Sequence, residues 1–100
     1  MSPINVCETA AELPQTWRSH LLGRFGDARL KVLRMDELPV VEEAHAEAEA
    51  LLVLDGRLEL VLAGQPVTVR RGELCVVPAG VPHAVAAGSG GTLLLVTTGD

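Results

Sequence analysis

Apolar and polar positions alternate along most of the chain, in short segments separated by turn-forming residues. The pattern predicts a strand over Ala28–Met35 and later apolar segments at Ala50–Leu54, Arg57–Leu62, Val67–Val69, Leu74–Val77, His83–Ala86 and Thr92–Thr97. About eight to ten short strands, with a turn every eight to twelve residues or so, are typical of an all-β sandwich or barrel. We therefore predict an all-β fold of two facing antiparallel sheets.

The interior of this fold should be aliphatic, because the chain has one Trp, one Phe and no Tyr. Alternation places six apolar side chains inside: Leu51, Val53, Val67, Val69, Leu93 and Leu95. Asp55-Gly56 is a strong hairpin signal between two of the predicted strands. A helix over Glu42–Leu54 is the main local alternative, since Ala and Glu are frequent there.

The first 27 residues are the least regular part of the sequence. Thr9 and Glu12 fit a helix capping box, and Pro14 limits any helix there to one or two turns. An edge strand is expected over Trp17–Gly23. We predict a single domain over residues 1–100, with this N-terminal segment followed by a barrel over residues 28–98.

Length and charge exclude several classes of function. The net charge is −5 and Arg70-Arg71 is the only pair of adjacent basic residues, so the chain lacks the basic face that nucleic acids require. The longest apolar run, Ala50–Leu54, is too short to span a bilayer. No signal peptide is visible, and Cys7 and Cys75 form neither a metal-type pair nor a disulfide framework. We expect unlinked thiols and a cytoplasmic protein.

A domain of 100 residues leaves a modest core. Self-association would bury more apolar surface and would cover exposed sheet edges. We therefore expect a homodimer, formed through the N-terminal strand around Trp17–Gly23.

Carboxylates and histidine cluster before the central apolar run. If the segment is extended, Glu43, His45, Glu47 and Glu49 share one face of a strand. That face is either solvated or a metal site inside the barrel. Ionised carboxylates facing an interior carry a desolvation cost of several kcal/mol each, and a divalent cation removes it. Imidazole and carboxylate together suit zinc, iron, manganese or nickel.

Two spaced motifs carry a family resemblance. The first reads Glu43-x-His45-x3-Glu49-x6-Gly56, and the second reads Gly72-x5-Pro78-x-Gly80-x2-His83. In this order, on short strands, they resemble the two motifs of the cupin superfamily, in particular its small single-domain, bacterial-type conserved barrels. The resemblance covers Leu38 to Val96.

The resemblance implies a double-stranded β-helix, a small jelly-roll barrel with a metal bound at its centre by three His and one Glu. By position, His45, Glu49 and His83 are three of the four ligands, and Glu43 occupies the place of the first His. A carboxylate there keeps a ligand oxygen, lowers the imidazole count and raises the negative charge. Two further departures are Ala87 in place of a frequent Asn and the absence of the Gly that often opens the first motif.

Three functions follow as hypotheses. The first is a metal-dependent enzyme acting on a small molecule, with chemistry of the dioxygenase, isomerase or decarboxylase kind that cupins perform. The second is a module that binds or senses a small ligand, with a structural metal or none, and the third is a metal-free dimerisation unit. Fold does not choose among them, and no catalytic residue is assigned beyond the ligand cluster.

Residues outside the motifs receive simpler interpretations. His20 is expected at the surface and Cys75 as a packed thiol of the core. Lys31 and Arg34 differ in parity, so at most one of them faces inward, where it would suit an anionic substrate. Trp17 and Phe25 are both N-terminal, which disfavours a large carbohydrate site and favours a small ligand in a Val/Leu/Ala-lined pocket.

Overall fold

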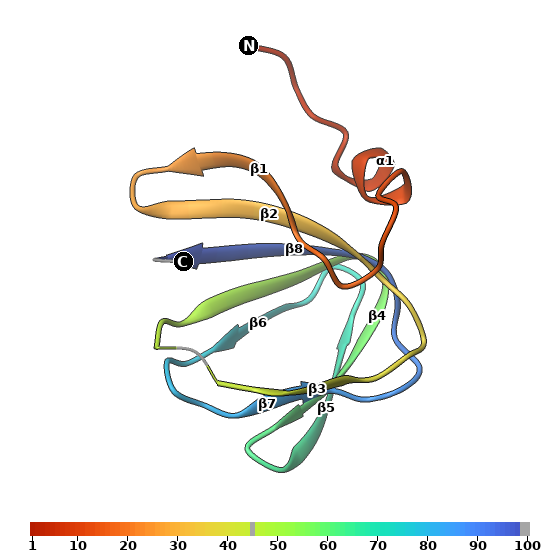
Figure 1. The fold of residues 1–100 in the computed structure, drawn as a ribbon, viewed down its shortest axis with the longest axis vertical. Coiled ribbons are helices and arrows are strands. Elements are labelled where there is room, and N and C mark those ends of the chain that lie inside the picture. The colour runs from red at the N-terminus through yellow and green to blue at the C-terminus, as the bar shows by residue number, and fades with distance from the viewer. Residues whose placement is uncertain (45, 99–100) are drawn as a thin grey trace.

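The computed structural model describes residues 1–44 and 46–98, without the side chain of Glu43. One short helix, α1 (Val6–Ala11), precedes eight strands (Figure 1). The strands are β1 (His20–Phe25), β2 (Ala28–Met35), β3 (Val40–Glu43), β4 (Glu49–Leu62), β5 (Gln65–Arg70), β6 (Leu74–Val77), β7 (His83–Val85) and β8 (Gly90–Thr98). All pairings are antiparallel.

The long strand β4 joins two layers of the barrel. Its first half pairs with β6 and β8, and β8 continues through β2 to β1. Its second half pairs with β5 and β7, and β7 continues to β3. The two groups face each other in Figure 1. This arrangement is the predicted jelly-roll barrel, and no helix occupies the described part of Glu42–Leu54.

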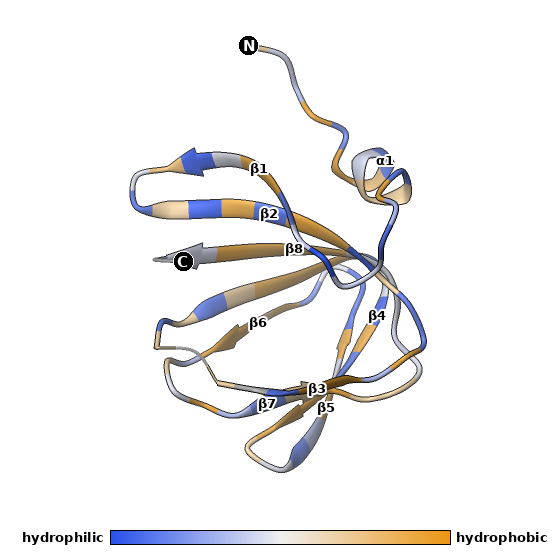
Figure 2. Cartoon of the chain, in the orientation of Figure 1, coloured by the Kyte–Doolittle hydropathy of each residue, from blue (hydrophilic) through white to orange (hydrophobic). Residues whose placement is uncertain are grey.

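The core lies between these layers and is aliphatic, as predicted. Leu51, Val53, Val69 and Leu93 are buried in it, and Val67 and Leu95 pack against it half-buried. In Figure 2 the hydrophobic colour runs along β8, the strand that contributes Leu93 and Leu95. All six side chains predicted for the interior therefore contribute to it.

The predicted hairpin at Asp55-Gly56 is wrong, because β4 runs through it without reversing direction. Gly56 has φ +75° and pairs with Gly91, which has φ +102°. A Cβ on Gly56 would overlap the carbonyl oxygen of Gly90, and one on Gly91 would overlap that of Asp55. The Asp-Gly pair thus marks a bend with close backbone approach, where the chain passes from one layer to the other.

Two local expectations near the N-terminus and the first motif also need correction. The helix begins after Asn5, whose Oδ1 accepts from the backbone N–H of Glu8 at 3.0 Å, while Glu12 is its C-cap. The predicted capping box is therefore in the wrong place. The segment between Glu43 and Glu49 is not one extended strand, since β3 ends and β4 begins there with a bend at Ala46-Glu47. Glu47 and Glu49, the described side chains of the predicted common face, therefore do not belong to one strand, and Glu47 is exposed.

An apolar surface lies on the outer side of the β2–β8–β4–β6 layer. Pairing aligns two rows across the four strands: Leu30, Val96, Ala50 and Val76 in one, and Val32, Leu94, Leu52 and Leu74 in the other. Helix α1 packs against β2 and β8, and Val32 is fully buried. Leu74 and Val76 stay 61% and 58% exposed.

A first prediction concerns the bend in β4. Gly56→Ala should cost about 3 kcal/mol or more, because it adds about 1–2 kcal/mol of left-handed strain to about 1–3 kcal/mol of overlap with the Gly90 carbonyl. Gly64→Ala is the matched control, since Gly64 has φ +82° with nothing near its Cβ position. Thermal unfolding of both variants measures the difference, and equal losses would contradict the role of close approach.

A second prediction is self-association through the outer rows. Two such faces are self-complementary and would pack sheet on sheet about a two-fold axis. Leu74→Glu should convert a homodimer into a monomer in light scattering at micromolar concentration. Leu21→Glu, on the exposed side of β1, tests the N-terminal strand as the interface instead. A monomeric wild-type protein would contradict both versions.

Candidate metal and ligand site

Glu49 and His83 meet inside the barrel although 33 intervening positions separate them in the chain. Glu49 opens β4 in one layer, where it pairs with Val77 and Thr97. His83 opens β7 in the other layer, where it pairs with Leu62 at the far end of β4. Glu49 Oε1 and His83 Nε2 lie 3.0 Å apart, and their side chains are only 14% and 11% exposed. The bend of β4 therefore brings both ends of one strand to one site.

Both ring nitrogens of His83 face oxygen atoms. Nδ1 lies 3.1 Å from the carbonyl oxygen of Val81, and Nε2 faces the Glu49 carboxylate. A neutral imidazole has one N–H, so both contacts together require a second proton or a cation beside Nε2. The Val81 carbonyl favours the proton on Nδ1, which orients the ring as backbone carbonyls do for metal-bound histidines.

These two side chains fit a metal ion. Two ligand atoms that are about 2.1 Å from one ion, at about a right angle, lie about 3 Å apart. The measured separation of 3.0 Å matches that spacing and is equally a charge-assisted hydrogen bond. Imidazole nitrogen with carboxylate oxygen is the donor set of zinc, iron, manganese and nickel.

The side chains of the other two predicted ligands, Glu43 and His45, lie outside the described structure. Glu43 pairs with His83 through the backbone, so it lies beside the site, but its side chain is outside the described residues, as is all of His45. Among the side chains that are described, no three from His, Cys, Asp and Glu are grouped to hold a metal. The four-ligand set stays a prediction.

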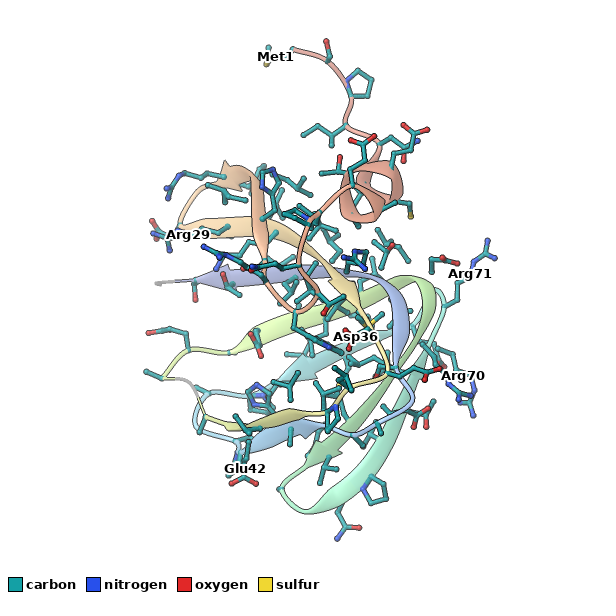
Figure 3. The ribbon with its side chains drawn as sticks, turned by 45° about the vertical axis from the view of Figure 1, so that its right-hand side comes forward. Met1, Arg29, Asp36, Glu42, Arg70 and Arg71 are labelled. Atoms are coloured by element: carbon teal, nitrogen blue, oxygen red, sulfur yellow. The ribbon has the colours of Figure 1, made fainter. Side chains whose placement is uncertain are left out.

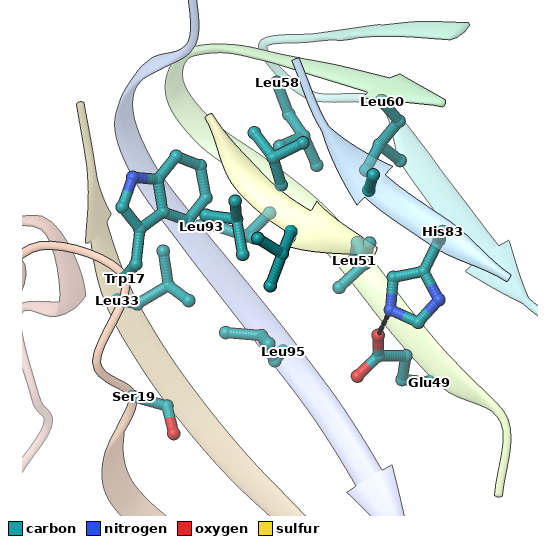
Figure 4. Close-up of a pocket in the computed structure, with 14 residues that line it drawn as sticks. Trp17, Ser19, Leu33, Glu49, Leu51, Leu58, Leu60, His83, Leu93 and Leu95 are labelled. Carbon is teal, nitrogen blue, oxygen red and sulfur yellow. Dashed lines mark ion pairs between the residues drawn. The ribbon is translucent and has the colours of Figure 1, made fainter. Parts of the chain in front are cut away.

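A cavity of about 170 Å³ opens between the layers, next to the Glu49–His83 pair. Figure 4 shows the pair at one side, Trp17 and Ser19 at the other, and leucines between them. The wall is mostly aliphatic: Leu33, Val40, Val41, Leu51, Leu58, Leu60, Val85, Leu93 and Leu95 contribute to it. A cavity of about 150 Å³ holds one benzene molecule, so the ligand that this space admits is small.

Trp17 lines this cavity, contrary to its expected place away from the site. Its φ is +62°, a strained conformation for a bulky residue. Its backbone N–H donates to the Arg34 carbonyl at 2.9 Å, and its indole N–H donates to Asp36 Oδ1 at 2.9 Å. The chain after α1 thus folds back onto β2 and presents the indole to the interior. No local sequence signal distinguishes this Trp from a surface residue.

Asp36 is the anchor of that arrangement. Its carboxylate accepts from the Thr16 hydroxyl at 2.6 Å, the Trp17 indole and the Leu38 backbone N–H at 2.9 Å. These bonds, that of Thr16 first, lower the pKa of Asp36 below the ordinary carboxyl value, against a small opposing effect of desolvation. No sequence pattern distinguishes Asp36, which simply follows a strand.

Lys31 and Arg34 of β2 face opposite sides of the strand, as their parity requires. Arg34 points outward, and its Nε and Nη2 donate to the Leu13 carbonyl at 3.2 and 3.0 Å. Lys31 faces the interior side, paired with Leu95, and lines a second cavity beside Glu49. His20 is exposed in β1, where a surface histidine was expected.

The cysteines behave as predicted in the described structure. Both are free thiols, Cys7 exposed and Cys75 half-buried against the core. Burial raises the pKa of the Cys75 thiol, which lowers its thiolate fraction near neutral pH. Cys75 is therefore a packing residue.

Comparison with known families identifies the class of protein. The family described as the cupin domain matches residues 36–99, which is more than half of the chain. The chain therefore belongs to the cupin domain family. Curated protein sequences include no match. In the described residues, no helix is long and apolar enough to cross a membrane.

Solved structures agree with this assignment at the level of the fold. A cupin-2 domain containing protein from Shewanella frigidimarina superposes with a TM-score of 0.86 at 24% identity, over 96% of this chain and 94% of that one. A protein from Neisseria meningitidis gives 0.83 at 21% identity, over 98% and 100%. Hydroquinone 1,2-dioxygenase from Sphingomonas sp. TTNP3, with 4-hydroxybenzoate bound, gives 0.81 at 18% identity, over 95% and 72%.

A third prediction tests the Asp36 anchor with the single tryptophan as reporter. Asp36→Asn should shift Trp17 emission to longer wavelength at neutral pH, because the indole loses a charged acceptor and becomes more solvated. Because the folded-state pKa of Asp36 is lowered, its bonds stabilise the fold above the unfolded carboxyl pKa of about 3.9. That stabilisation is lost as the pH falls through the lower folded value.

Wild-type emission should therefore change at a pH below the ordinary carboxyl pKa, and Asp36→Asn should lack that transition. Asp27→Asn, in the exposed turn between β1 and β2, is the control and should behave as the wild type. Far-UV circular dichroism at each pH separates the local change from global unfolding. Unchanged emission of Asp36→Asn at neutral pH would contradict the anchor.

Proposed function

We propose that this cupin binds a divalent metal between the two layers of its barrel and acts on a small molecule held in the adjoining cavity. The observation that carries the proposal is the 3.0 Å approach of the Glu49 carboxylate to the His83 imidazole at the wall of that cavity. Two largely buried polar groups aimed at one point in an aliphatic barrel need a cation or a shared proton. His45 and Glu43 complete the proposed ligand set.

Each described residue has a defined part in this proposal. His83 offers Nε2 because Val81 holds the proton on Nδ1, and Glu49 offers an oxygen beside it. When bound, a metal of this kind supplies Lewis-acid or redox chemistry at an open coordination position. Trp17 and the leucines around it exclude water from the rest of the cavity and admit an apolar body about the size of one ring.

Two structural neighbours give the enzyme proposal a direction. Hydroquinone 1,2-dioxygenase and salicylate 1,2-dioxygenase are both dioxygenases by their names. The superposition with the second includes 72% of this chain but only 21% of the salicylate enzyme. Their likeness to this chain lies in the fold, and a fold hosts many reactions. We therefore propose a metal-dependent small-molecule enzyme without assigning dioxygenation, isomerisation or decarboxylation. We propose a cytoplasmic location for it, in line with its free thiols.

One observation favours a second candidate, a module that binds or senses a small ligand. Of the described residues that line the cavity, Glu49 and His83 alone have titratable side chains. Among the described residues that line this cavity, none is left to act as a separate general acid or base. A site with a structural metal, or none, would need nothing more than these walls.

A fourth prediction tests the metal. His83→Ala should remove most bound metal, measured by elemental analysis after exposure to zinc, iron, manganese or nickel, while the barrel stays folded. Glu49→Gln should weaken binding by about 10-fold or more, because it removes a charged ligand. Affinity should fall on acidification, since protons compete for the ligand atoms.

Matched controls separate the site from the surface. His20→Ala removes an exposed imidazole of β1, and Glu42→Gln removes an exposed carboxylate that points away from the barrel in Figure 3. Both should keep the wild-type metal content. A wild-type protein that takes up none of the four metals at neutral pH would defeat the metal proposal and leave the ligand-binding module.

A further inference from the structure

A second cavity, called the mouth below, adjoins the first. Ser19, Glu49 and Leu95 line both. The mouth cavity has a volume of about 380 Å³, and its remaining walls come from β2, the segment before β4, and the end of β8. In Figure 4, Leu95 lies between Ser19 and the Glu49–His83 pair. A ligand in the inner cavity therefore reaches this mouth past Leu95.

Lys31 brings a positive charge to that mouth. It lies one inward position before Leu33, which lines the inner cavity, and it pairs with Leu95 in β8. The residue is half-buried. Among the side chains that the structure describes, its ammonium group has no carboxylate partner at ion-pair distance and no hydrogen bond. A cation placed this way favours an anion as the next group to enter.

An unsatisfied hydroxyl lies beside it. Thr97 lines the same mouth, and its Oγ1 is buried without a hydrogen-bond partner among the described residues. Buried polar atoms without a partner are rare and call for an explanation. Thr97 pairs with Glu49, and Leu95, two residues earlier, pairs with Lys31. The hydroxyl, the ammonium group and the metal-ligand carboxylate thus occupy adjacent positions on one inner face.

We propose that Lys31, with the hydroxyl groups of Thr97 and Ser19, forms an anion-binding subsite that selects small carboxylates as ligands of this cupin. This inference rests on the proposed function, because it identifies the class of molecule that the cavity beside Glu49 and His83 receives. The carboxylate binds at the mouth, and the apolar body extends past Leu95 toward Trp17. A cavity of about 170 Å³ limits that body to about the size of one ring.

The charge of the site explains why a cation is needed there. Glu47 and Glu49 line the mouth as well, and the protein carries a net charge of −5. Of the described residues that line the mouth, Lys31 alone is positively charged, so without it a carboxylate ligand would meet only Glu47 and Glu49 among the charged lining residues. With it, the ligand gains a charge-assisted hydrogen bond in a partly desolvated position, where such a bond is strongest.

The test compares carboxylates with their uncharged amides in the metal-loaded protein. Benzoate against benzamide and butyrate against butyramide are the probes, followed by Trp17 fluorescence and calorimetry. We expect at least one carboxylate to bind at least about 10-fold more tightly than its amide, as the difference of one charge between the two probes would produce. Lys31→Met should reduce that ratio to about 1–2 at unchanged metal content, and Lys31→Arg should retain most of it.

Two further variants complete the design. Thr97→Val should weaken the carboxylate a few-fold and leave the amide unaffected. Arg71→Met removes an exposed cation at the other side of the molecule in Figure 3, and should change nothing. A bound metal itself prefers carboxylates. The decisive quantity is therefore the change in the carboxylate-to-amide affinity ratio between the wild type and Lys31→Met.

Each outcome decides the proposal. No binding of any of the four probes at millimolar concentration, or a carboxylate preference that survives Lys31→Met, overturns the subsite. The same titrations on protein stripped of metal separate it from the proposed function. A Lys31-dependent preference in a protein that binds no metal supports the subsite and defeats the metal. If the protein binds metal but Lys31→Met does not change the carboxylate preference, the metal proposal is supported and the subsite is overturned.

Discussion

The close approach of two backbones at Gly56 and Gly91 is the constraint on which the rest of the structure depends. It lets β4 pass from one layer of the barrel to the other while it stays paired with β8, with one register shift between Val53 and Asp55. One end of β4 therefore carries Glu49 in the first layer, and the other end pairs with His83 in the second. Any side chain at the bend would push the strands apart and separate the two halves of the site.

The site that results has a polar side and an apolar side within one continuous space. Glu49 and His83 form the polar side, and Trp17, held by Asp36, closes the apolar side. Strain at Trp17 persists because several hydrogen bonds fix its surroundings, a pattern typical of ligand-binding positions. Lys31 then places one positive charge at a mouth that Glu47 and Glu49 also line.

Period-two alternation and turn residues were sufficient to predict the all-β barrel, its six interior side chains and the β2 strand. These patterns gave a wrong prediction where the same residues are compatible with two backbone conformations. Asp55-Gly56 forms a hairpin in an isolated chain, but tertiary pairing with β8 turns it into a bend. The motif spacing predicted that Glu49 and His83 meet. Trp17 and Asp36 depend on contacts between segments 19 residues apart, for which the sequence carries no local pattern.

The central claim is that Glu49 and His83 hold a cation between the two layers. The most direct measurement is anomalous diffraction from crystals grown with manganese or zinc, collected on both sides of the absorption edge of that metal. The account predicts one strong anomalous peak at about 2.0–2.3 Å from both Glu49 Oε1 and His83 Nε2. No peak there, with the carboxylate and imidazole still in direct contact, would contradict it.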